Sequence, residues 1–159
     1  MIALEVVMEA GRWEGAGLDV ALAERAAAAA LRAAPEAPHD DVAATLLLAD
    51  DATVQALNRE WRGQDKPTNV LSFPSSAPAI PGEPRHLGDV ALAFETVVRE
   101  AETEGKSVAD HAAHLVVHGI LHLIGRDHET DGEADAMESV EIAALSILGI
   151  PDPYRDVTA

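Results

Sequence analysis

The chain has 159 residues and a formal net charge of −17, because 28 aspartates and glutamates outweigh 11 lysines and arginines. It contains no cysteine, which excludes a disulfide scaffold, a thiolate zinc site and a cysteine nucleophile. The length is typical of one domain with its own core, and the acidic charge argues against a surface that coats nucleic acid.

The first half of the chain predicts strands that alternate with helices. In order, the expected elements are a strand over 2–8, a helix over 19–34, a strand over 42–49, a helix from 50 or 51 to about 62, and a strand over 68–73. Asp19 is placed to cap the first helix and Pro35 to end it, and Asp50 or Asp51 can cap the second helix. The strand over 42–49 is almost wholly apolar, which indicates burial on both of its faces.

The second half predicts a long loop, one strand and three helices. In order, these are a loop over 74–86, a strand over 87–94, and helices over 95–104, 107–124 and 131–148. Ser107 is a candidate cap, and Gly149 follows the last helix. The order β-α-β-α-β-β-α-α-α favours an α+β fold, with a small mixed four-stranded sheet packed with about five helices. We expect residues 1–159 to form a single domain.

The sequence predicts a soluble, cytoplasmic protein. No apolar run approaches the roughly 20 residues that span a bilayer. The segment from Met1 to Gly11 holds Glu5 and Glu9 and lacks the basic start of a signal peptide.

Three histidines near the end of the predicted helix 107–124 have the spacing of metal ligands. His118 and His122 are four residues apart, so both imidazoles lie on one helix face, one turn apart. Gly125 can end the helix in a left-handed turn, after which His128 can return to the same point. Three imidazoles with an open fourth position are typical of a catalytic zinc site. We therefore predict one Zn²⁺ per chain on a central buried helix, although other divalent transition metals suit the same ligands.

Ordinary core histidines are a weaker interpretation. Within 112–124 the only polar side chains are His114, His118 and His122. Burying an unpaired imidazole costs on the order of 1–3 kcal/mol, so the three need partners, and a shared metal supplies them.

The same spacing occurs in metzincin proteases, whose general base is the glutamate directly after the first histidine. Here that residue is Gly119. The pattern therefore favours metal-dependent hydrolysis and argues against peptide hydrolysis.

Other polar residues surround the three histidines. Asp127 either orients an imidazole or makes a turn after Gly125. His111 and His114 continue the histidine stripe, and we expect a polar helix edge there, with His114 kept as a candidate substrate contact.

A cluster of positive charge precedes the strand over 68–73. Arg59, Arg62 and Lys66 lie within eight positions of an otherwise acidic chain. Such a cluster suits an acidic or phosphate ligand. The alternative is ordinary charge at a helix C-terminus, which complements the helix dipole.

With these segments the chain resembles the YbeY family of bacterial metal-dependent endoribonucleases, which act in ribosomal RNA maturation. The resemblance spans about residues 57–154 and rests on Leu57-Asn58, Trp61-Arg62-Gly63, the run Asp65–Pro74, Leu87-Gly88-Asp89, the histidine frame with Gly119 and Asp127, and Asp152-Pro153-Tyr154. One departure is Arg126, where other members carry tyrosine.

The resemblance implies zinc held by His118, His122 and His128, and an activity that depends on Arg62. It implies cleavage of single-stranded RNA, maturation of the 16S rRNA 3′ end and ribosome quality control. The ribosome or its small-subunit proteins are the expected partners, and no DNA or membrane is expected. Arg59, Lys66 and His114 remain candidate substrate contacts, and the nucleophile is either metal-bound hydroxide or the RNA 2′-OH.

Two alternative functions remain open at this point. One is a metallohydrolase that acts on another substrate, because three histidines alone do not select RNA. The other is a ribosome assembly factor whose metal is mainly structural.

Overall fold

The computed structural model describes residues 1–76, 78 and 80–154. Over these residues the chain forms five α-helices, one short 3₁₀ helix and four strands. Their bounds, in order, are β1 (Ile2–Met8), η1 (Gly11–Trp13), α1 (Val20–Ala33), β2 (Val42–Ala49), α2 (Asp51–Arg62), β3 (Val70–Pro74), β4 (Arg85–Ala93), α3 (Phe94–Glu104), α4 (Val108–Leu123) and α5 (Asp131–Ile147). The predicted α+β class and element order are thereby confirmed.

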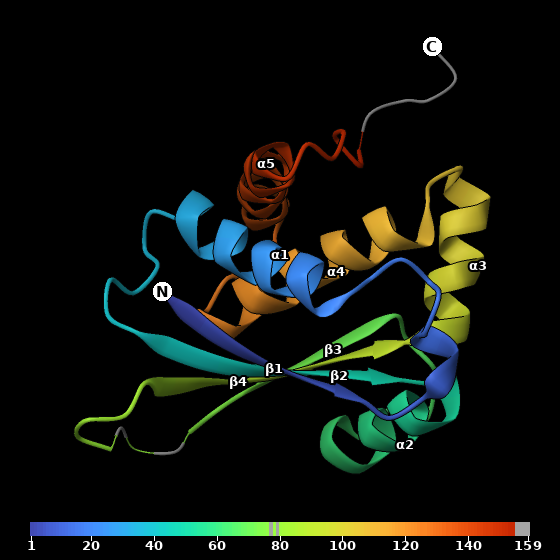
Figure 1. Ribbon diagram of the computed structural model, residues 1–159, viewed down its shortest axis with the longest axis horizontal. Coiled ribbons are helices and arrows are strands. Elements are labelled where there is room, and N and C mark those ends of the chain that lie inside the picture. Colours follow the sequence, from blue (N-terminus) through green and yellow to red (C-terminus); the bar gives the residue numbers. More distant parts are fainter. Residues whose placement is uncertain (77, 79, 155–159) are drawn as a thin grey trace.

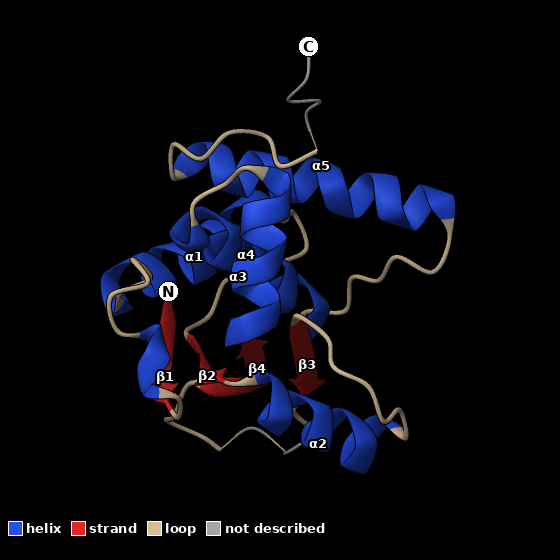
Figure 2. Ribbon diagram, turned by 90° about the vertical axis from the view of Figure 1, so that its right-hand side faces the viewer, coloured by secondary structure: helices blue, strands red, loops and turns tan. Residues whose placement is uncertain are grey.

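The four strands form one mixed sheet in the order β1-β2-β4-β3 (Figure 2). β1, β2 and β4 run parallel, and β3 pairs antiparallel with β4. This arrangement puts β3 at one edge, where Ser72 pairs with Val90 of β4.

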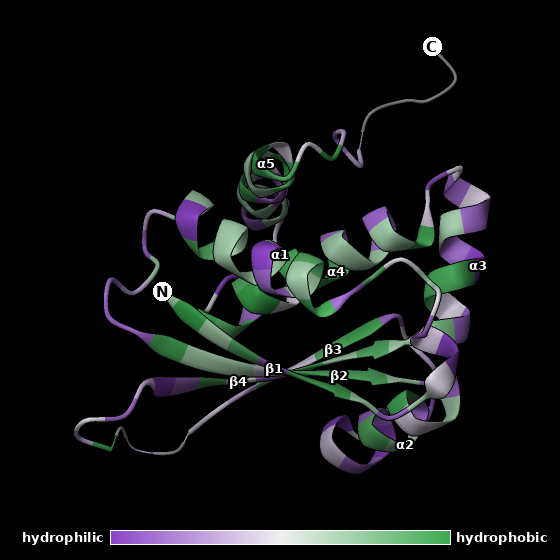
Figure 3. Cartoon of the chain, viewed as in Figure 1, coloured by the Kyte–Doolittle hydropathy of each residue, from purple (hydrophilic) through white to green (hydrophobic). Residues whose placement is uncertain are grey.

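The helices cover the two faces of the sheet unequally. α1 and α4 lie on one face, and α5 lies across them as an outer layer (Figure 1). α2 lies on the opposite face, where Val54 packs against Leu71 in a small second core. The main core is formed by buried apolar residues of the strands and of α1 and α4, and the colouring of Figure 3 shows how hydrophobic the strands are.

The burial of β2 differs from its prediction. Val42, Ala44, Leu46 and Leu48 are buried, whereas the alternate residues 43, 45 and 47 are only partly buried. The reason is that α2 covers only part of the second face, so β2 is fully covered on one face rather than on both.

The predicted helix caps are confirmed. The carboxylate of Asp19 accepts the backbone N–H of Leu22 at 2.7 Å, and that of Asp50 accepts the N–H of Thr53 at 2.8 Å. The Ser107 hydroxyl likewise accepts the N–H of Asp110 at 3.0 Å.

Differences from the predicted elements are small and fall mainly at the β3–β4 hairpin. β3 covers Val70–Pro74 rather than 68–73, and β4 already starts at Arg85. The loop therefore spans 75–84 instead of the predicted 74–86, and its residues 77 and 79 lie outside the described ones. The 3₁₀ turn at Trp13 was not predicted; its indole N–H donates to the carbonyl of Ala49 at 2.8 Å.

α4 is the central buried helix, and it approaches the sheet closely at Gly119. A Cβ added there would lie 2.6 Å from Val90 Cγ1 of β4 and 3.2 Å from Ser72 Oγ of β3. The Ser72 hydroxyl donates to the Gly119 carbonyl at 3.1 Å, which ties the helix to the edge strand. No side chain fits between helix and sheet at this position.

Replacing Gly119 by alanine should therefore destabilise the protein even though alanine favours helices. We expect a loss of about 1–3 kcal/mol in the free energy of unfolding, the usual cost of overpacking a core. Gly132→Ala is the matched control, because Gly132 lies in α5 with nothing within 4 Å of its added Cβ. Urea unfolding of both variants checks this, and a Gly119→Ala protein as stable as the Gly132→Ala protein would contradict it.

Candidate metal centre

The three histidines of the predicted metal site come together at the C-terminal end of α4. His118 and His122 lie on the last turns of this helix. Gly125 follows with a φ of 101°, a conformation that L side chains rarely adopt, and turns the chain back. His128, in the segment before α5, then returns to the two helical histidines as the spacing predicted.

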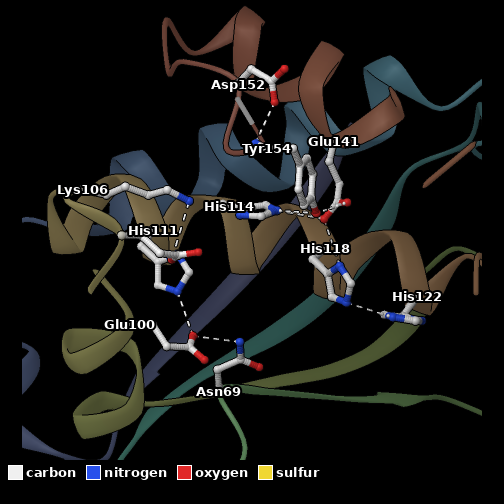
Figure 4. Close-up of polar contacts among 11 residues, drawn as sticks. Asn69, Glu100, Lys106, His111, His114, His118, His122, Glu141, Asp152 and Tyr154 are labelled. Atoms are coloured by element: carbon white, nitrogen blue, oxygen red, sulfur yellow. Dashed lines mark hydrogen bonds and ion pairs between the residues drawn. The ribbon is translucent and has the colours of Figure 1, made fainter. Parts of the chain in front are cut away.

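One ring nitrogen from each of His118, His122 and His128 lies within 4.8 Å of the others. The Nε2 atoms of His118 and His122 face each other at 3.0 Å (Figure 4). The first two side chains are partly buried and His128 is exposed. The cluster therefore opens to solvent on the side of His128.

His122 has a lowered pKa that suits a metal ligand. Burial, together with the positive charges that His118 and His128 would carry, lowers the pKa of His122 to about 4. His122 is thus neutral near pH 7 and offers a lone pair. A set of three imidazoles with one side open to solvent fits a divalent transition ion, zinc among them.

Glu141, a carboxylate that the sequence analysis missed, lies directly behind the cluster. It belongs to α5 and is 1% exposed. Its Oε1 lies 2.9 Å from His118 Nδ1 and 2.9 Å from His114 Nε2 (Figure 4). Burial by itself raises the pKa of Glu141, but the hydrogen bonds from His114 and His118 outweigh it and lower the pKa to about 2. The carboxylate is therefore ionised and accepts both bonds.

Tyr154 completes this network from the segment after α5. Its hydroxyl donates to Glu141 Oε2 at 2.8 Å and lies 3.3 Å from His114 Nε2. Burial and the negative charge of Glu141 raise the pKa of the phenol, so it remains a donor at neutral pH.

The expected polar helix edge at His111 and His114 is wrong, because both side chains are buried. His111 Nε2 lies 2.9 Å from a carboxylate oxygen of Glu100 in α3, which also accepts from the amide of Asn69 at 2.9 Å (Figure 4). The acidic partners come from α3 and α5, which pack on either side of α4. His114 lines a neighbouring cavity of about 470 Å³ rather than the one that holds His122 and His128.

A cavity of about 620 Å³ joins the histidine cluster to the predicted basic segment. Arg62 and Lys66 line it together with His118, His122 and His128. Arg59 is not among its lining residues; it is exposed and pairs with Asp65 at 3.7 Å. Two of the three basic candidates therefore share a cavity with the histidines.

Arg62 is held in place by the edge strand. It is the last residue of α2, before Gly63 with a φ of 68°. Its guanidinium donates to the carbonyl of Ser72 and lies 5.7 Å from the ring centre of Phe73. Since Ser72 also donates to Gly119, this strand connects Arg62 to the helix that carries His118.

Two residues beside the third histidine have structural contacts. Asp127 accepts the backbone N–H of His128 at 2.8 Å. This is a contact within the turn after Gly125, one of the two roles that the sequence suggested for Asp127. Arg126 pairs with Glu36 at 2.9 Å and also lines the cavity. Arg126 therefore contributes a cation that is paired with Glu36 to the lining of the cavity.

None of the described helices is long and apolar enough to cross a membrane.

Comparisons of the sequence with a family model and with curated relatives point to the same family. Residues 16–149 match the family model described as endoribonuclease YbeY. The chain is 57% identical to endoribonuclease YbeY of Paramagnetospirillum magneticum over 136 residues, 83% of this chain and 82% of that one. It is 50% identical to endoribonuclease YbeY of Rhodopseudomonas palustris strain BisA53 over 157 residues, 97% of this chain and 91% of the relative. The solution structure of TM1509 from Thermotoga maritima has the same fold, with a TM-score of 0.58, 22% identity and 99% of both chains covered.

The stability of the metal-free protein should fall as the pH is lowered. The pKa of His122 is about 4 in the folded chain, against an ordinary 6.5, so the unfolded chain binds more protons between these values. The free energy of unfolding therefore decreases as the pH falls from 6.5 to 4. Glu141 continues the loss from 4.5 to 2, because its folded pKa of about 2 also lies below its ordinary value.

Urea unfolding in the presence of a chelator, repeated across this pH range, measures the effect. His122→Asn should flatten the upper part of the profile and leave the lower part in place. A wild-type profile that is flat between pH 6.5 and 4 would contradict the assignment of a neutral His122.

Proposed function

Because the chain belongs to the endoribonuclease YbeY family, we propose that it is a zinc-dependent endoribonuclease specific for single-stranded RNA. We further propose that it acts in maturation of the 16S rRNA 3′ end and in ribosome quality control. The observation that carries the proposal is the shared cavity, which is lined by the three histidines together with Arg62 and Lys66. The combination suits a phosphodiester, which needs positive charge around its oxygens.

The three histidines His118, His122 and His128 would hold the zinc. When bound, the ion supplies Lewis acidity toward a phosphoryl oxygen and lowers the pKa of bound water. The protein contributes neutral imidazoles, which leave the charge of the ion undiminished, and a side open to solvent through which RNA can approach.

Arg62 would bind the scissile phosphate. Its guanidinium is always charged and offers several N–H donors in a planar fork, which matches the geometry of phosphate oxygens. One of its donors is engaged by the carbonyl of Ser72, which orients the group at the lining of the cavity. Lys66 adds a second positive charge to the lining of the same cavity, so the protein can stabilise charge that develops on the phosphate.

The nucleophile cannot be activated by a glutamate after the first histidine. Gly119 occupies that position, and its close contact with Val90 leaves no room for a longer side chain. The site therefore differs from that of a metzincin in its packing as well as in its sequence, which is consistent with a phosphodiester rather than a peptide substrate.

The charge of the whole chain favours single-stranded over duplex RNA. At a net charge of −17, most of the surface repels phosphates. A rigid duplex would bring many phosphates against that surface, whereas a flexible single strand can place one phosphate in the cavity. The acidic exterior also suits basic ribosomal proteins as partners.

The direct test is cleavage of a single-stranded RNA and of the same sequence in a duplex, with the zinc content measured in parallel. We expect cleavage of the single strand, loss of activity on chelation, and recovery with zinc. His118→Ala should lose both zinc and cleavage while remaining folded by circular dichroism. Full activity in the metal-free protein would contradict the proposal, and unfolding of His118→Ala would favour a mainly structural metal.

Replacing Arg62 by alanine should reduce the cleavage rate about 10²–10³-fold, the usual cost of losing one preorganised donor to a developing charge. The zinc content should not change, since Arg62 is not a ligand. Arg62→Lys should recover only part of the rate, because lysine keeps the charge and loses the planar fork.

The matched control for this series is Arg32→Ala, which removes an exposed arginine from the last turn of α1. Rate measurements on single-stranded RNA at fixed salt compare the variants. Full activity of Arg62→Ala would exclude the proposed role of Arg62.

A further inference from the structure

We propose that Glu141 is a positioning residue of the metal centre, which fixes the orientation of His118 while Tyr154 holds Glu141 in place. The inference rests on the metal site of the proposed function and extends it to α5 and to the segment that follows it. In Figure 4, the side chains of Glu141 and Tyr154 approach α4 from above and meet it at His114 and His118.

The burial of Glu141 shows that it is held there by specific partners. It lies on the inner face of α5 with Met137, Ala144 and Leu145, all of which are buried. A buried carboxylate without partners is costly, so it persists only where hydrogen bonds satisfy it. Glu141 has three such contacts, with His114, His118 and Tyr154. The described residues thus engage both of its oxygens.

The contact with His118 determines which ring nitrogen can bind a metal. An ionised carboxylate only accepts hydrogen bonds, so His118 Nδ1, at 2.9 Å, must carry the hydrogen. The nitrogen left for a metal is then Nε2, the atom that faces His122 Nε2 at 3.0 Å. Histidines that bind metals commonly donate their other N–H to a carboxylate, which fixes the tautomer and raises the basicity of the ligand.

His114 fixes the position of the carboxylate along α4. It lies one turn before His118 and donates Nε2–H to the same oxygen of Glu141 at 2.9 Å. Its Nδ1 is buried and has no hydrogen-bond partner among the described residues, so the carboxylate is the contact that orients this ring. Two successive turns of the helix therefore hold one oxygen of Glu141.

Tyr154 holds the other oxygen. Its hydroxyl donates to Oε2 at 2.8 Å, and its backbone N–H is bound by the carboxylate of Asp152 at 2.8 Å. This turn places the phenol against the ring of His114, with ring centres 5.5 Å apart. The contact gives the Asp152-Pro153-Tyr154 segment a role at the metal centre, although it lies outside the cavity that His128 lines.

The first experiment measures zinc affinity by competition with a chromophoric chelator. Glu141→Ala should bind zinc about 10–100-fold more weakly than the wild type, the usual effect of losing such a partner. Glu141→Gln should lose less zinc affinity, because its amide oxygen can still accept the hydrogen bond from His118. Tyr154→Phe should show the smallest loss of zinc affinity. Glu133→Gln, which removes an exposed charge from the same helix, should bind zinc as the wild type does.

The second experiment reads the tautomer of His118 in the metal-free protein by ¹⁵N NMR of the histidine side chains. We expect hydrogen on Nδ1 in the wild type and in Glu141→Gln, and its loss from Nδ1 in Glu141→Ala. This readout needs neither metal nor activity, and a residue that merely filled space would not change it.

The outcomes separate this inference from the proposed function. A wild-type protein that binds no zinc would overturn the metal site itself. Tight zinc binding by the wild type with unchanged affinity in Glu141→Ala would overturn the role of Glu141 alone. If Glu141→Ala does not fold, the zinc affinities of Glu141→Gln and Tyr154→Phe test the inference instead. Wild-type zinc affinity in both variants would overturn it.

Discussion

The close approach of α4 to the sheet at Gly119 is the constraint on which the rest of the site depends. Backbone lies against Val90 here because no side chain intervenes, so the helix is buried along almost its whole length. This contact fixes the depth and rotation of α4. His118 and His122 consequently emerge at the edge strand, and the position that holds a general base in metzincins is closed by packing.

Ser72 links the position of α4 to the position of Arg62. Its hydroxyl binds the Gly119 carbonyl, and its own carbonyl accepts from Arg62. Arg62 and His118 therefore take their places from the same short strand, although they lie on helices that cover opposite faces of the sheet. A cation and a ligand set held by one rigid element can act on one phosphate with little reorganisation, which is what electrostatic stabilisation requires.

The sequence predicted the parts of the site that depend on local spacing and missed those that depend on helix packing. The four-residue separation of His118 and His122 and the turn at Gly125 are local, and the structure brings these histidines together with His128 as expected. Glu141 comes from a different helix, and a glutamate in an acidic chain is ordinarily solvated. The available signal was its spacing from buried Met137 and Leu145, four residues on either side, which places it on the apolar face of α5.

The location of negative charge makes the proposed phosphate substrate compatible with so acidic a chain. A carboxylate ligand would offset part of the charge of a bound ion, whereas three neutral imidazoles leave that charge available to the substrate. Glu141 lies behind His118, where its charge is shared with His114 and Tyr154 and is shielded from the cavity. The cavity wall itself carries Arg62, Lys66 and Arg126 against Asp127 and Glu129. Because Glu141 is buried next to His118 and does not line the cavity, it can orient this histidine without adding negative charge to the cavity.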